Sequence, residues 1–205
     1  MEYNSHYSNE KLTYTPEGNL VDSSGLEVMM KWESGIMEHQ AATITKNRGD
    51  ILNVGFGLGL IDNYIQSYNP KSHTIIESNK DVQKKMIDGG WLEKPNVTLI
   101  FKPWQEVIND LPKFDGIFYD CWLDDQQPFD ENVKNILNPE GIYSFFNNPI
   151  NGEVNNISTK SYNILSKFCD ITSRSINIDY IDIKKHNYWD LDNKIYWIPE
   201  CRLKT

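Results

Sequence analysis

Three glycines at alternate positions end an apolar run near the first quarter of the chain, and this segment constrains the fold most. The run begins at Ile51 and ends in Gly55, Gly57 and Gly59. A buried parallel strand entering a tight turn has this pattern, because glycine lets the backbone turn sharply and lie against a ligand. It indicates a nucleotide-type cofactor. The spacing lacks the third glycine of a dinucleotide fingerprint, which disfavours hydride transfer with a nicotinamide.

Glu77 closes the next apolar run, residues 73–77. An acid at the end of a second strand, at this distance from a glycine loop, can hold ribose hydroxyls. The loop and Glu77 together predict an adenosine site. The alternative is a glycine-rich turn with an incidental acid.

Strand and helix patterns alternate along the rest of the chain, which predicts a parallel sheet with helices on both faces. An i, i+4 apolar stripe that includes Trp32 begins the series of helices. Helices are predicted over residues 27–46, 58–68, 81–90, 104–111, 129–137 and 160–169, and strands over residues 51–54, 73–77, 96–101, 114–120, 141–146, 175–183 and 194–198.

Residues 1–27 are polar and rich in turn formers, with scattered tyrosines. We expect no core element there, although a hairpin from residues 11–14 to residues 19–21 fits the pattern. Two interpretations stay open: a flexible tail, or a flap that closes over a site and excludes water. The expected organisation is an arm over residues 1–27 and a single domain over residues 28–205.

Charge and cysteine content narrow the classes of partner. The net charge is −9 without a lysine-arginine block, which disfavours nucleic acid and permits a cationic partner. Cys121, Cys169 and Cys201 are far apart, so we expect neither a disulfide framework nor a metal site, and a reducing cytoplasm fits best. Without an apolar leader or spanning run, we expect a soluble protein with no membrane partner. Monomer and homodimer are both open.

The carboxyl ends of the predicted strands should form the site, since open parallel sheets bind ligands there. This rule gathers the glycine loop, Glu77 and residues 102–104, 120–122 and 147–151 at one rim. The residue types suit adenosylmethionine: glycine backbone beside the amino-acid part, Glu77 on the ribose diol, and Trp104 or the chain before it beside adenine.

Asp120 ends the fourth strand, where a carboxylate would face a transferring methyl group. Glu33, beside the apolar stripe of the first helix, could reach the same space or remain a solvated rim residue. Two carboxylates suit a guanidinium group, whose planar fork accepts bidentate hydrogen bonds. They would hold a nitrogen near the methyl carbon and accept its proton. Alternatively, Asp120 caps the next element and the nearby acids, Asp124, Asp125 and Asp130, form a solvated loop.

These segments, taken together and in order, resemble the guanidinoacetate N-methyltransferase and arginine δ-N-methyltransferase (type IV protein arginine methyltransferase) group. The resemblance rests on residues 28–37, which include Met-Met-Lys-Trp-Glu, on the glycine loop, on Ile-Ile-Glu at 75–77, and on residues 114–120 and 141–147. The arginine δ branch is more similar, because of residues 11–14, 90–97 and 196–203.

The resemblance implies a class I methyltransferase fold, which is a Rossmann-like α/β three-layer sandwich with a mostly parallel seven-stranded sheet. It implies adenosylmethionine as methyl donor, with S-adenosylhomocysteine as product, and no metal. It makes Asp120 and Glu33 catalytic, with Asp120 accepting the proton. The donor site it implies consists of Met37, Gly55, Gly57, Gly59, Glu77, Ser78, Pro103, Trp104 and Asp120, and the acceptor site of Tyr14, Glu33, Asp120, Cys121, Trp122 and Asn147, with Tyr14 in a lid.

Two departures bear on the acceptor. Guanidinoacetate enzymes carry Thr-Tyr where this chain has Cys121-Trp122, and their substrate-carboxylate loop differs from residues 148–151. Eukaryotic arginine δ enzymes usually carry an ankyrin-type region, whereas this sequence starts close to the catalytic segment. Free arginine, arginine in a protein and another small guanidino compound therefore stay open. So do a different amine acceptor and a non-catalytic adenosylmethionine-binding subunit.

Overall fold

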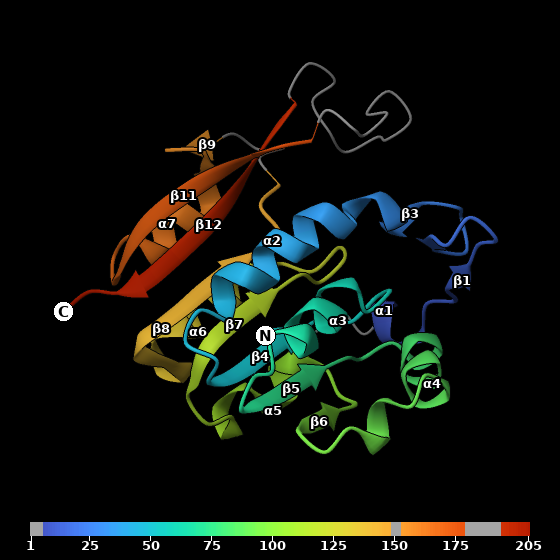
Figure 1. The fold of residues 1–205 in the computed structure, drawn as a ribbon. Helices are drawn as coiled ribbons and strands as arrows, with labels where there is room; N and C mark the ends of the chain where they lie inside the picture. Colours follow the sequence, from blue (N-terminus) through green and yellow to red (C-terminus); the bar gives the residue numbers. More distant parts are fainter. Residues whose placement is uncertain (1–5, 149–152, 179–193) are drawn as a thin grey trace.

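A seven-stranded sheet forms the centre of the molecule in a computed structural model that describes residues 6–148, 153–178 and 194–205 (Figure 1). The strand order is β11-β12-β8-β7-β4-β5-β6. The strands are β4 (Asp50–Val54), β5 (Ser72–Ile76), β6 (Val97–Ile100), β7 (Phe114–Tyr119), β8 (Leu137–Phe145), β11 (Cys169–Asn177) and β12 (Ile195–Leu203).

The five strands from β4 to β8 run parallel, and β12 pairs antiparallel with both β8 and β11. The chain moves outward from β4 through β5 to β6, then returns to place β7 on the other side of β4. Strand order therefore reverses between β4 and β7. Their carboxyl ends form the switch point at which open α/β sheets bind ligands.

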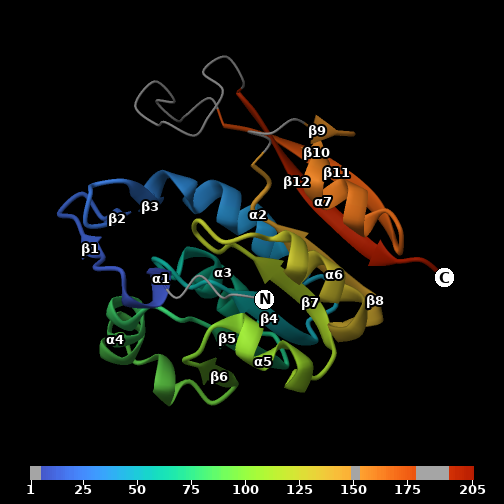
Figure 2. The same ribbon diagram turned by 180° about the vertical axis from the view of Figure 1, so that it is seen from behind.

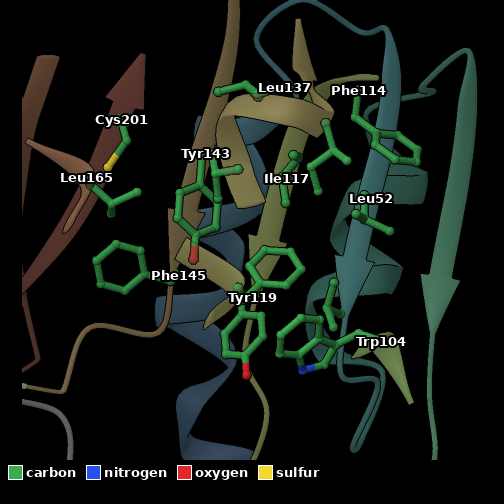
Figure 3. Close-up of a cluster of buried hydrophobic side chains, with 14 of the residues drawn as sticks. Leu52, Trp104, Phe114, Ile117, Tyr119, Leu137, Tyr143, Phe145, Leu165 and Cys201 are labelled. Carbon is green, nitrogen blue, oxygen red and sulfur yellow. The ribbon is translucent and has the colours of Figure 1, made fainter. Parts of the chain in front are cut away.

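Helices cover both faces of the sheet, as the alternation predicts (Figures 1 and 2). Side chains alternate along β4: Leu52 packs with α5 and α6, and Ile51 with α2 and α3. Figure 3 shows the first of these two clusters. The helices are α2 (Ser34–Ile44), α3 (Leu60–Ser67) and α4 (Lys80–Asp88) on one face, and α5 (Trp104–Val107), α6 (Gln127–Ile136) and α7 (Thr159–Leu165) on the other. The predicted three-layer sandwich is confirmed.

The N-terminal segment is more structured than its composition suggests. After α1 (His6–Asn9), strands β1 (Thr13–Tyr14), β2 (Leu20–Val21) and β3 (Glu27–Met29) form a small antiparallel sheet. The predicted hairpin is confirmed, but the absence of a core element is wrong, because Leu12 and Leu20 are buried in the core.

The first predicted helix begins later than expected. Residues 27–29 form β3, because Met29 pairs with Leu20 across the small sheet and packs into the core. A 3₁₀ turn, η1 (Lys31–Glu33), then leads into α2. The helix predicted from residue 27 therefore begins only at residue 34.

Further differences from the predicted elements concern the lengths of elements, short 3₁₀ turns and one hairpin. Helix α5 gives way to a 3₁₀ turn, η3 (Ile108–Asp110), and α7 ends at Leu165, so that β11 begins at Cys169. A hairpin of β9 (Glu153–Val154) and β10 (Ile157–Ser158) was not predicted, although Asn155 and Asn156 take the positive φ angles that such turns favour. Another 3₁₀ turn, η2 (Trp91–Glu93), precedes β6. Residues 179–183 of the predicted strand and 149–151 of the predicted rim lie outside the described residues.

In the described ranges, no helix is both long enough and apolar enough to span a bilayer.

Candidate active site

A cavity of about 650 Å³, including its open mouth, lies at the carboxyl ends of β4, β5 and β7. The structure brings nine of the sequence-predicted residues into its lining: Gly55, Gly57, Glu77, Ser78, Pro103, Trp104, Asp120, Cys121 and Trp122.

The glycine loop forms the floor of this cavity with backbone that side chains could not replace. Gly55 has φ +95°, and a Cβ there would lie 2.0 Å from the Asp120 carbonyl oxygen. Gly57 has φ +55°, and its Cβ would lie 2.8 Å from the Met29 sulfur. Gly59 begins α3 and does not line the cavity. The packing of the protein itself therefore requires glycine at Gly55 and Gly57, and both residues line the cavity.

A buried polar chain beneath the loop fixes its conformation. The Asn53 amide donates to the Gly55 carbonyl at 2.9 Å and to Asp62 at 2.8 Å. His73 Nε2 lies 3.2 Å from the same Asp62 oxygen, and Gln66 contacts the other ring nitrogen at 3.1 Å. Sequence reasoning missed this set. The available signal was Asn53 itself, a polar residue inside an apolar strand.

Glu77 is held rigidly at the cavity wall. It is 1% exposed, and its two oxygens accept the Phe56 N–H at 3.0 Å and the Asn79 N–H at 2.7 Å. Burial raises the pKa of Glu77, although these N–H donors oppose the shift. Each carboxylate oxygen has a second lone pair, so the group can also accept from a ligand hydroxyl.

Asp124 gathers three donors beside the cavity. One of its oxygens accepts from Trp104 Nε1 at 2.7 Å, Gln105 Nε2 at 3.1 Å and the Tyr119 hydroxyl at 3.1 Å. Trp104 is 4% exposed and packs against Phe129, and Figure 3 shows Trp104 and Tyr119 side by side at one end of the cluster. Asp124 is therefore an anchoring residue, whereas one alternative from the sequence placed it in a solvated loop.

Asp130 is a second acid with a defined partner. It is fully buried on α6 and accepts the Tyr143 hydroxyl at 2.6 Å. The interpretation of these acids as one solvated loop is wrong for Asp124 and Asp130, and it holds only for Asp125, which is exposed.

Asp120 lies at the end of β7 and keeps part of its surface in the cavity. The surrounding protein withdraws its carboxyl group from water and raises its pKa to about 7. Gly55 and Val54 fix its backbone, since the Asp120 N–H donates to the Val54 carbonyl at 2.9 Å.

Glu33 is not a solvated rim residue. It is 4% exposed, and one oxygen accepts the Met30 N–H at 2.8 Å. It lies outside the cavity lining, but Glu33 and Asp120 both interact electrostatically with the hydroxyl of Tyr196. Both acids therefore lie within electrostatic range of one buried tyrosine.

Three other predicted site residues lie outside the lining. Met37 is fully buried in the core on α2. The Tyr14 hydroxyl donates to the Gly57 carbonyl at 3.3 Å, from outside the loop. The Asn147 amide donates to the carbonyls of Asn156 and Trp197 and accepts from the Ser158 N–H, which ties β8 to β10 and β12.

The N-terminal segment covers one side of the cavity. Tyr7 lines it and lies against Trp122, with ring centroids 6.1 Å apart. Asn79, two residues after Glu77, donates to the backbone carbonyls of Tyr7 at 2.7 Å and Glu10 at 2.9 Å. Sequence reasoning did not assign Tyr7 or Asn79 to the site, because only the fold brings residues 70 positions apart together.

In the parts of the chain that the structure describes, no group of three or more histidine, cysteine or acidic side chains is arranged to hold a metal ion.

Comparison with solved structures identifies the architecture. The precorrin-6y C5,15-methyltransferase from Geobacter metallireducens superposes with a TM-score of 0.60 at 14% identity, covering 89% of this chain and 96% of that one. At this identity the similarity shows the fold alone. The fold is that of the class I methyltransferases.

Two relatives found by sequence are more similar to this chain than that structure is. Both are named protein arginine N-methyltransferase 2. That of Yarrowia lipolytica is 34% identical over 217 residues, covering 95% of this chain and 45% of its own length. That of Candida glabrata is 41% identical over 153 residues, covering 69% of this chain and 37% of its own. This chain thus spans less than half the length of either relative.

The family follows from a match over most of the chain. The sequence profile described as guanidinoacetate N-methyltransferase matches residues 2–185. The segments that carry the resemblance fall within it, apart from the last one, and the relatives named for arginine agree with the arginine δ branch. The chain belongs to the guanidinoacetate N-methyltransferase family.

Proposed function

We propose that this protein transfers a methyl group from adenosylmethionine to a guanidino nitrogen. The observation that carries the proposal is the place of Asp120: a carboxyl group withdrawn from water, in the same cavity as the glycine loop and Glu77. A donor site and an acidic acceptor site would thus share one enclosed space.

The cavity residues fit adenosylmethionine. Glu77, already fixed by two N–H donors, would accept from the ribose hydroxyls, and the backbone of Gly55 and Gly57, which lines the cavity, would lie beside the methionine part. Trp104 and Pro103 would line the adenine end. When bound, adenosylmethionine would supply a methyl group on a positively charged sulfur.

Asp120 would bind the guanidinium group and turn one nitrogen toward that methyl group. The carboxylate would accept the proton that this nitrogen loses as it becomes methylated, which is a general-base role. Holding the nitrogen close and aligned would supply much of the rate acceleration. Glu33 would act as the second carboxylate, because a planar guanidinium presents donors on two edges.

The charge of the lining favours a cationic acceptor. Its described acids are Glu77, Asp120 and Asp124, and its one described cation is Lys102, which is exposed. We place free arginine, arginine in a protein and small guanidino compounds in this class. Cys121 and Trp122 line the cavity next to Asp120 and would contact the acceptor, with Asn147 supporting that wall.

We further propose that residues 1–27 act as a lid on a catalytic domain formed by residues 28–205. Tyr7 and Tyr14 would be its contacts with the site, and the Trp122 indole, which donates to the Glu27 carbonyl at 2.8 Å, would join it to the acceptor wall.

The three cysteines are unpaired thiols, which fits a reducing compartment such as the cytoplasm.

A methyl-transfer assay tests the proposal. Purified protein and labelled adenosylmethionine would be incubated with free arginine, guanidinoacetate or arginine-containing peptides, and mass spectrometry would locate the added methyl group. We expect label on a guanidino nitrogen of at least one acceptor. Calorimetric binding of adenosylmethionine without transfer to any of them would instead support a non-catalytic binding subunit. Transfer only to an amine would show that the acceptor is an amine and not a guanidino compound.

A further inference from the structure

A leucine with a strained backbone lies at the opening of the cavity. Leu123 lines the cavity, yet its side chain is 67% exposed. Among the described lining residues, Lys102 is the other exposed one. Because both residues line the cavity and reach solvent, they mark its opening. Leu123 belongs to the loop that begins at Asp120, whereas Lys102 directly precedes Pro103 at the end proposed for adenine.

The backbone of Leu123 has a conformation that leucine rarely adopts. Its φ is +55°, at the third position of a turn in which the Asp124 N–H donates to the Cys121 carbonyl at 3.3 Å. Glycine or asparagine usually occupies such a position, because a Cβ crowds the backbone there. Of the five non-glycine residues with positive φ in the described ranges, three are asparagines and Leu123 is the only apolar one. Leucine at this position is therefore less favourable for folding than asparagine would be.

Both neighbours of Leu123 are fixed, so the strained turn keeps its place. The Trp122 indole donates to the Glu27 carbonyl at 2.8 Å. On the other side, the Asp124 carboxylate accepts from the Trp104 indole at 2.7 Å. These contacts hold the turn while the leucine side chain remains mostly in solvent.

Packing inside the protein does not explain this leucine. A side chain that is 67% exposed removes little apolar surface from water, so it offsets little of the backbone strain. Strain of this kind collects at binding sites, where the surroundings fix the backbone. Leu26, which precedes Glu27, is also exposed, at 42%. Leu26 and Leu123 thus each adjoin one of the two residues that join the N-terminal arm to this loop.

An acceptor held by Asp120 must extend out through the cavity opening. Free arginine ends in a charged ammonium group and a charged carboxylate, and a leucine side chain can pair with neither. In a polypeptide these groups are amides, and the residues on either side of the arginine bring their own side chains to the opening. An exposed leucine can bury its apolar surface against an apolar neighbour of this kind.

We propose that Leu123 and Leu26 form an apolar patch that binds an apolar residue next to the acceptor arginine of a polypeptide. The inference rests on the proposed function and assigns its acceptor to arginine within a peptide or protein. The acids of the cavity would select the guanidinium group, and the apolar patch would select the residues that flank it. Leucine is present at a position that favours asparagine because it contributes to acceptor binding.

The test is Leu123→Asn, assayed with two peptides that carry one arginine between leucines or between glycines. We expect the wild type to show a kcat/KM about tenfold higher for the leucine-flanked peptide, the size of burying part of a leucine side chain. Leu123→Asn should abolish this preference by raising KM for that peptide, with kcat unchanged. Its Tm should rise by about 2–4 °C, because asparagine tolerates a positive φ.

Arg48→Asn is the matched control for relief of strain. Arg48 is exposed and has φ +47°, but it precedes β4, at the end of that strand opposite the cavity. This change should raise the Tm similarly and leave the peptide preference intact. The proposal is overturned by a wild type without a preference, by a preference that survives Leu123→Asn, or by free arginine as a better acceptor than either peptide. A lower Tm in Leu123→Asn would also overturn it, since leucine would then serve the fold.

Binding measured without turnover separates this proposal from the proposed function. Calorimetry with S-adenosylhomocysteine present would give the Kd of each peptide for the wild type and for Leu123→Asn. If no guanidino compound is methylated, the proposed function fails, and the difference in Kd between the two peptides still decides whether the apolar patch binds. If methylation occurs and neither kcat/KM nor Kd responds to the flanking residues, only the role of the apolar patch fails.

Discussion

Gly55 and Asp120 are in main-chain contact: a Cβ on Gly55 would lie 2.0 Å from the Asp120 carbonyl oxygen. The two residues end neighbouring parallel strands, β4 and β7, at the point where strand order reverses. The glycine loop proposed for the donor and the acid proposed for the acceptor are therefore parts of one structure. A substitution at Gly55 should therefore also disturb the position of Asp120.

Gly55→Ala should damage both stability and donor binding. The methyl group would clash with Asp120 at a residue whose φ is +95°. We expect the free energy of unfolding to fall by about 2 kcal/mol or more, and adenosylmethionine affinity to fall more than tenfold, by denaturant titration and calorimetry. Gly25→Ala is the matched control, because Gly25 has φ +85° with nothing within 4 Å of its added Cβ. Equal effects of the two changes would mean that strain alone, and not contact with Asp120, makes glycine necessary.

Asp120→Asn should abolish transfer and spare donor binding. An amide cannot accept the proton from the nitrogen, so we expect kcat to fall about a hundredfold to ten-thousandfold. Calorimetry should show donor affinity within a few-fold of the wild type. Asp125→Asn, at an exposed position in the same loop, is the control and should transfer methyl groups normally. Parallel loss of donor affinity in Asp120→Asn would assign Asp120 to the donor site instead.

The same substitution should increase stability at alkaline pH. The folded-state pKa of Asp120 is raised to about 7, above the value of about 3.9 in an unfolded chain. Between these values the folded state binds more protons, so this group makes stability fall as pH rises. Asp120→Asn removes that cost. We expect a higher Tm than the wild type at pH 8, and a difference that shrinks toward zero as the pH is lowered to 4. A pH-independent difference would show that the carboxyl group is not destabilised by its surroundings.

The lid proposal is best tested by a short truncation. Deleting residues 1–20 would remove Leu12 and Leu20 from the core, so the deletion should end at residue 10. It takes away Tyr7 and the carbonyls that Asn79 binds. We expect Michaelis constants for both substrates to rise several-fold, with Tm lowered by only a few degrees.

Leu20→Ala gives the contrasting result for a core position. It should cost about 2–5 kcal/mol of folding free energy and leave the Michaelis constants of the folded enzyme unchanged. Unchanged Michaelis constants in the truncated protein would show that the arm is only a structural cover.

The sequence by itself determined the layer architecture and the main points of the candidate site. Apolar runs that alternate with helical patterns along the chain predicted the parallel strands, because the side chains of a strand buried on both faces must be apolar. Gly55, Glu77 and Asp120 could be assigned to one rim because parallel strands end on the same side of a sheet. Local patterns carry this information without tertiary contacts.

Only the tertiary structure decided what depends on contacts between distant segments. Met29 belongs to a strand because Leu20 pairs with it, and Asp124 became an anchor because Trp104 and Tyr119 point at it. Tyr7 lies against Trp122, more than 100 positions later in the chain, and no local pattern joins them. Hydrogen bonding and burial are properties of the folded surroundings, so the sequence could name the acids but not the groups that hold them.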